Sequence, residues 1–343
     1  MADEREGITK MSSQLIRTVV VGAFLAAGLS ACSQSANQPP QSTASETTPA
    51  APAAPAACDA ACLTGDFDQL LQAIVAHDPS KAPLAANVKY TENAQVLQVG
   101  DGIWGVASAL PSNYKLVIPD PTTGQLAFHV VMKESGNAVW YAGRMKVENG
   151  KITELETMVV RGGGFANYDR TPDPVWATVV PPDQRSSRDV MIKDANMYFD
   201  ALQDNKANYV PFADDCGRVE NGVVTANNPK AKAQPGRPNI GAMSCTGNIN
   251  SMMWRYITKI DQRHLAAIDE THGIVSMVVM FNQAGDVDST VIPGFGEYKY
   301  TGAAHRPFNA LILESFKVVN GKIRQIAATL TTLPYGAKDG WGD

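Results

Sequence analysis

Two glutamates in this 343-residue chain lie at matching points of two similar segments. Residues 83–94 read PLAANVKYTENA and residues 211–222 read PFADDCGRVENG, so Glu92 and Glu220 each precede an asparagine near the segment's end. A glutamate that faces an apolar interior has its pKa raised by desolvation, and can then take a proton from a carbon next to a carbonyl. The alternative interpretation is that Glu-Asn only turns the chain and the carboxylate is solvated.

Other polar residues offer fewer catalytic patterns. The densest cluster is Asp269, Glu270 and His272 in IDETHGIV, which is either a site or a turn into the next strand, and we favour the turn. His129, in the strand-like QLAFHVVM, either lines a pocket or is a satisfied core histidine. The sequence contains no Gly-x-Ser-x-Gly, Walker or dinucleotide motif and no histidine pair at metal-ligand spacing. We therefore expect no cofactor and no metal.

Four cysteines follow the N-terminal region, and an even number predicts two disulfides in an oxidising compartment. The spacing CDAAC makes Cys58–Cys62 a local pair, which leaves Cys216–Cys245. A four-cysteine zinc site is the alternative, but cysteines this scattered match zinc spacing poorly.

The N-terminal residues are typical of a targeting segment. Lys10 and Arg17 precede TVVVGAFLAAGL, which is too short to span a bilayer but suits a signal peptide. The LSAC that ends at Cys32 resembles the bacterial lipoprotein signal, whose cysteine is lipidated; an ordinary signal peptide is the alternative. We expect a lipoprotein signal peptide over 1–31, lipidation of Cys32 and a Pro/Ala/Ser/Thr-rich tether over 32–57. Ser33, rather than Asp, follows the cysteine, so this resemblance implies lipid anchoring in the bacterial cell envelope, at the outer membrane.

The two glutamates belong to a longer internal similarity. KVENGKI at 146–152 returns as KVVNGKI at 317–323, and each predicts a hairpin with an Asn-Gly turn. Apolar residues at helical spacing predict helices over 66–78 and 188–205. A helix followed by a curved antiparallel sheet is an α+β arrangement. The predicted organisation is a domain over 58–162, a linker over 163–187, a domain over 188–335 with an insertion at about 223–265, and a tail over 336–343.

This order of elements resembles the nuclear-transport-factor-2-like (NTF2-like) superfamily, which includes ketosteroid isomerases, SnoaL-type cyclases and scytalone dehydratase. The resemblance implies two tandem cone-shaped α+β domains, with Glu220 at the general-base position and Tyr198 at that of the tyrosine that donates to the oxyanion. In the first copy Glu92 holds the base position and Leu70 replaces the tyrosine. The family's second donor, a protonated aspartate, falls near Leu313, a departure that argues against ketosteroid chemistry. The two-copy, cysteine-containing pattern also resembles an uncharacterised family of secreted proteins.

We expect the protein to bind a small, largely apolar molecule in a cone. One alternative is a cofactor-independent isomerase, dehydratase or lyase with Glu220 as base and Tyr198 as donor to the enolate. A further alternative is an interaction module whose open sheet faces pack on each other or on a partner. The net charge of −5 lacks the positive excess that is typical of nucleic-acid-binding proteins. The expected partners are therefore the small-molecule ligand and, through the lipid on Cys32, a membrane. The predicted ligand-binding residues are Trp104, His129, Tyr141, Arg218, Trp254, Asp269, His272 and Tyr298.

Overall fold

The computed structural model describes residues 58–162 and 165–342, which fall within a single compact unit. The predicted signal peptide, Cys32 and the tether lie outside the described residues. In the part of the chain that is described, no helix has the length and apolar character needed to cross a membrane. Helices and curled sheets occur together, so the α+β class is confirmed, and the curled sheets are consistent with a cone-like fold.

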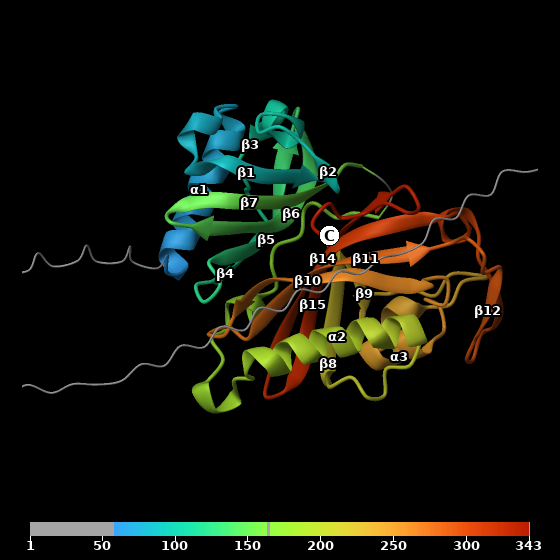
Figure 1. The fold of residues 1–343 in the computed structure, drawn as a ribbon. Coiled ribbons are helices and arrows are strands. Elements are labelled where there is room, and N and C mark those ends of the chain that lie inside the picture. The colour runs from blue at the N-terminus through green and yellow to red at the C-terminus, as the bar shows by residue number, and fades with distance from the viewer. Residues whose placement is uncertain (1–57, 163–164, 343) are drawn as a thin grey trace, which may run out of the picture. The chain divides into compact units, whose positions relative to one another are not determined.

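The first sheet has seven strands in the order β2-β1-β7-β6-β5-β3, with β4 also paired to β5. Strands β1 and β7 pair in parallel, and the neighbouring pairs are antiparallel. Helix α1 packs on this sheet (Figure 1) through Phe67, Leu70 and Ile74, which are fully buried. The elements are α1 (Ala60–Val75), β1 (Leu84–Glu92), β2 (Gln95–Val96), β3 (Ala107–Ala109), β4 (Lys115–Asp120), β5 (Gln125–Glu134), β6 (Asn137–Glu148) and β7 (Lys151–Val160).

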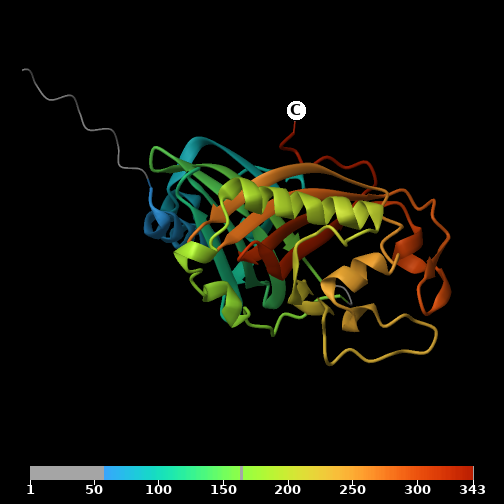
Figure 2. The same ribbon diagram turned by 90° about the horizontal axis from the view of Figure 1, so that it is seen from below.

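The second sheet has six strands in the order β10-β11-β14-β15-β8-β9. Its helix α2 begins after the N-cap Ser187, whose side chain accepts the N–H of Val190, and runs over the strands (Figure 2). The elements are α2 (Arg188–Asp204), β8 (Phe212–Glu220), β9 (Val223–Ala226), α3 (Cys245–Asn250), β10 (Lys259–Asp269), β11 (Ile274–Gln283), β14 (Phe308–Val319) and β15 (Lys322–Leu333), with a separate hairpin of β12 (Ser289–Ile292) and β13 (Gly296–Lys299).

Both sheets follow one strand order. The series β2-β1-β7-β6-β5 in the first corresponds to β9-β8-β15-β14-β11 in the second, and β8 pairs in parallel with β15 as β1 does with β7. The two predicted Asn-Gly hairpins are confirmed: Asn149 and Gly150, like Asn320 and Gly321, adopt the positive φ that such a turn requires. A duplicated domain would give both halves the same strand order, but the duplication itself stays a prediction.

The second half carries two additions where the sequence predicted one. Residues 227–258 lie between β9 and β10 and contain α3, inside the predicted range of 223–265. Residues 284–307 lie between β11 and β14 and contain the β12–β13 hairpin, where the first sheet has only the turn at Ser135 and Gly136. This second segment lies outside the predicted range of 223–265.

Both predicted disulfides are confirmed. Cys58–Cys62 lies at the start of α1, and Cys216–Cys245 joins β8 to α3. This excludes the four-cysteine zinc alternative, because all four sulfurs are used.

The sheet faces turned away from α1 and α2 share one hydrophobic cluster. Met158 and Ala142 contribute to it from the first sheet, and Val278 and Leu313 from the second. The helix-covered face of each sheet has a cluster of its own. Each sheet is therefore covered by apolar side chains on both faces.

Candidate functional site

A cavity of about 350 Å³ lies between α2 and the second sheet. Strands β8, β11, β14 and β15 and the addition at 227–258 complete its wall. The wall is mostly apolar and includes the aromatic rings of Trp254, Tyr256 and Phe281. Its size and its apolar character are those of a small-molecule site. The chemistry rests on four polar residues of the wall: Tyr198, Arg218, Glu220 and Glu314.

Strand register brings the two acids together. Ala328 of β15 pairs with Glu220 of β8 on one side and with Glu314 of β14 on the other. Residues paired across neighbouring strands point to the same face of the sheet, and such strands lie about 4.8 Å apart. The two carboxyl groups therefore face the cavity on either side of one small side chain.

Glu314 is the desolvated acid of the site. Burial raises its pKa to about 8, and the nearby charge of Glu220 acts in the same direction. The hydrogen bond with Tyr198 and the positive charge of Arg218 oppose this rise. At neutral pH the Glu314 carboxyl is therefore mainly protonated, and it can donate a hydrogen bond as a neutral acid.

Arg218 is held from several sides. Its Nη1 donates to the Tyr198 hydroxyl at 3.4 Å, its Nη2 donates to Asn248 Oδ1 at 2.8 Å, and its Nε lies 3.3 Å from Glu220 Oε1. The Trp254 indole N–H donates to the same Asn248 oxygen at 2.9 Å, and its ring centroid lies 5.0 Å from the guanidinium carbon. Asn248 belongs to α3, so the addition closed by the second disulfide positions the polar end of the cavity.

Four residues predicted from the sequence line this cavity: Tyr198, Glu220, Arg218 and Trp254. Burial raises the pKa of Tyr198 well above its ordinary value, so its hydroxyl stays protonated and available as a donor. The side chain of Glu220 is mostly buried and paired with Arg218. The cavity also contains a second acid, Glu314, which was not singled out from the sequence.

Glu92, predicted at the equivalent place in the first sheet, belongs to a closed set of contacts. Its carboxylate accepts the Ile103 N–H at 2.7 Å and the Tyr90 hydroxyl at 3.1 Å, and it pairs with Arg161 at 2.8 Å. Glu92 of β1 pairs with Thr157 of β7, and Thr157 pairs in turn with Gly143 of β6. In this row of paired residues, Gly143 stands where the second sheet has Glu314. The first sheet thus lacks the second acid of this row.

Six predicted ligand-binding residues lie elsewhere. The side chains of Trp104 and Tyr141 are buried in the core between α1 and the first sheet. Tyr298 lies on the β12–β13 hairpin, where its ring contacts Phe295 and Tyr300. Asp269 and His272 form the favoured turn: the Asp269 carboxylate accepts the His272 backbone N–H at 2.9 Å and contacts its Nδ1 at 2.7 Å.

His129, the sixth, is a satisfied core histidine between the sheets. Its Nδ1 lies 2.8 Å from the Thr329 hydroxyl and its Nε2 lies 2.9 Å from that of Ser315, both on the second sheet. Burial lowers its pKa to about 3, so the ring is neutral at ordinary pH.

Glu314 was missed because the family's second donor was assigned to Leu313, one residue away. Leu313 faces the cluster shared by the two sheets. In LILESFKVV the residues alternate, and Ile312 and Phe316 belong to the cluster under α2. A glutamate that occupies the core face of an alternating strand is the signal that could have identified it.

Comparisons with known proteins yield a family match and distant structural likenesses. Residues 184–330 match the model of a domain of unknown function, DUF8021. A phenazine biosynthesis-related protein from Pseudomonas aeruginosa is 12% identical, with a TM-score of 0.25 over 42% of this chain and 82% of its own. A "Putative Isomerase from Bacillus subtilis" is 7% identical, with a TM-score of 0.23 over 42% of this chain and 87% of its own. A search of curated proteins found no match. At these identities and scores neither structure bears on the function of this chain.

Proposed function

We propose that the protein binds a small, largely apolar molecule in the cavity under α2, with a carbonyl or similar acceptor placed at Tyr198 and Glu314. The observation that carries the proposal is the neutral, buried acid of Glu314 beside the Tyr198 hydroxyl in an otherwise apolar cavity. Tyr198 and Glu314 are both uncharged hydrogen-bond donors. An unpaired polar group is costly in an apolar surrounding, so these donors suit an uncharged oxygen acceptor that pairs with them. The aromatic wall suits a flat, apolar body.

A second candidate function is cofactor-independent proton transfer, which the carboxylate of Glu220 opposite the neutral Glu314 favours. The C–H bond next to the carbonyl breaks, its proton passes to Glu220, and its electron pair moves onto the carbonyl oxygen. The donors Tyr198 and Glu314 hold the resulting enolate, and each such donor is typically worth about 3 kcal/mol. Return of the proton to another carbon completes an isomerisation, whereas loss of a β-hydroxyl with that proton, as water, completes a dehydration.

The test of binding is thermal stabilisation of the purified protein by a panel of enolisable ketones and β-hydroxy compounds that carry an apolar ring. Ala328→Leu fills the space between the two acids and is expected to abolish stabilisation, while Glu297→Gln, an exposed change on β13, leaves it intact. Equal stabilisation of Ala328→Leu and wild type would contradict binding in this cavity.

Turnover of the same panel separates the two candidates. Glu220→Gln removes the base and is expected to reduce turnover by about a hundredfold or more, because a general base contributes about that much. Binding without turnover by wild type leaves the binding function alone.

We also propose that the chain is an extracytoplasmic lipoprotein anchored through Cys32 and built from two duplicated NTF2-like domains. Two disulfides support an oxidising compartment. Labelling of cells with a palmitate analogue tests the anchor, since Cys32→Ser is expected to lose the label and to leave the membrane fraction.

A further inference from the structure

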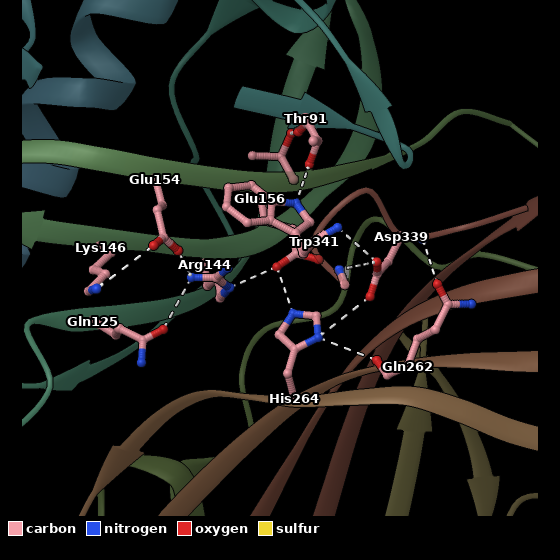
Figure 3. A network of polar contacts seen from close by, with 12 residues as sticks. Thr91, Gln125, Arg144, Lys146, Glu154, Glu156, Gln262, His264, Asp339 and Trp341 are labelled. Carbon is pink, nitrogen blue, oxygen red and sulfur yellow. Dashed lines mark hydrogen bonds and ion pairs between the residues drawn. The ribbon is translucent and has the colours of Figure 1, made fainter. Parts of the chain in front are cut away.

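The C-terminal residues, predicted only as a tail, make specific contacts with the first sheet (Figure 3). We infer that residues 336–342, the strap, fasten the second sheet to the first, and that the side chain of His264 makes this fastening sensitive to pH. The strap begins at Gly336, whose N–H donates to Asn309 of β14 at 3.0 Å. The inference concerns the joint between the sheets and is independent of the cavity under α2.

Trp341 fixes the far end of the strap on the first sheet. Its indole N–H donates to the Thr91 hydroxyl of β1 at 2.8 Å. Two cations contact its ring: Lys89 Nζ lies 4.2 Å and Arg144 Cζ lies 4.6 Å from the ring centroid. A tryptophan is the best partner among aromatic side chains for such cations, so this end of the strap is held by more than apolar burial.

Asp339 gives the strap its bend and its link to β10. Its Oδ1 accepts the backbone N–H groups of Trp341 at 2.8 Å and Gly342 at 3.1 Å. Its own N–H donates to the Gln262 side chain at 2.8 Å. Its other carboxylate oxygen, buried with the rest of the side chain, lies 3.7 Å from Nδ1 of His264, a nitrogen that also lies 3.3 Å from the Gln262 carbonyl oxygen.

His264 links three elements. Its Nε2 lies 2.8 Å from Glu156 of β7, its Nδ1 faces Asp339, and Arg144 of β6 donates to the same Glu156 oxygen at 2.7 Å. Glu154 and Lys146 line the same hollow beside the strap. The dashed contacts of Figure 3 run from the histidine both to the strap and to the first sheet.

The sign of the pH effect follows from these neighbours. Burial lowers the pKa of His264, and so does the positive charge of Arg144, but the hydrogen bond and charge of Glu156, with the charge of Asp339, outweigh them and raise the pKa above 6.5. The protonated imidazole attracts both carboxylates, and this contribution is fully present below the ordinary histidine value. It is lost as the pH rises through the raised value of the folded protein. The strap is therefore fastened most firmly in mild acid.

The test is the ¹⁹F NMR spectrum of the full chain labelled with 5-fluorotryptophan, recorded from about pH 5 to about pH 9, across the range in which a histidine titrates. Trp341→Phe assigns the resonance of the strap. We expect this resonance to shift with a midpoint above 6.5, and to keep its high-pH position at every pH in His264→Gln.

His272→Gln is the matched control, because His272 also pairs with an aspartate but lies away from the strap; its Trp341 resonance is expected to titrate as in wild type. Asp339→Asn removes one of the two acids, and the midpoint should fall. The inference would be overturned if the Trp341 resonance of wild type did not shift with pH. It would also be overturned if that resonance shifted with the wild-type midpoint in a folded His264→Gln protein.

Discussion

Replacing Glu314 by glutamine is expected to stabilise the protein at neutral and alkaline pH. The wild-type carboxyl must either stay protonated in the fold while the unfolded chain ionises, or ionise in an apolar surrounding. Glutamine has nearly the same shape, stays neutral in both states and avoids this cost. Stability lost at a polar site of this kind is typical of positions kept for function.

The magnitude follows from the pKa of Glu314, which lies at about 8 in the fold against an ordinary value of 4.5. In this interval the folded protein binds more protons than the unfolded chain, so its free energy of unfolding falls as pH rises, by about 1.4 kcal/mol per pH unit. We expect Glu314→Gln to gain about 3 kcal/mol at pH 7 and about 5 kcal/mol at pH 9. The gain should vanish below the ordinary value, where both states are protonated.

The assay is urea unfolding of wild type and variant at about pH 4, 7 and 9, with the free energy taken by linear extrapolation. The other titrating groups contribute equally to the free energy of unfolding of both proteins, so their contributions cancel in the difference. Glu297→Gln, an exposed change, is the control and should show no such trend.

A difference that is the same at all three pH values would refute the assignment of Glu314 as a buried neutral acid. A variant less stable than wild type at pH 9 would show that ionised Glu314 makes favourable contacts, contrary to the desolvation argument.

Two further predictions concern stability. Replacing Cys216 and Cys245 by serine opens a loop with a sequence separation of 29, and should lower the free energy of unfolding by about 3–4 kcal/mol, measured by urea unfolding under oxidising conditions. For His129, the pKa of about 3 lies below the ordinary 6.5, so only the unfolded chain takes up the proton between these values, and wild-type stability falls as the pH is lowered through that window. His129→Gln should lose less stability on acidification; a steeper loss in thermal unfolding would contradict this sign.

Local sequence determined much of the fold. The Asn-Gly pairs predicted both hairpins because only a few residue types accept positive φ at low cost. Helical spacing predicted α2 and the later part of α1, which begins six residues before the predicted start at 66, since burial of one apolar stripe is a property of a single segment. Cysteine number and spacing predicted both disulfides. Tyr198 and Glu220, both of which line the cavity, were singled out through the resemblance to the NTF2-like superfamily.

What only the tertiary structure decided depends on which strands become neighbours. Glu314 faces Glu220 because β15 pairs with both β8 and β14, and no local pattern states that register. The same register places Gly143 opposite Glu92, so two similar segments acquire different chemistry. The contact of His129 with Thr329 and that of His264 with Glu156 each join residues that are more than a hundred positions apart. A carboxyl or an imidazole has its pKa set by the burial and charges around it, and those surroundings exist only after the sheets have packed.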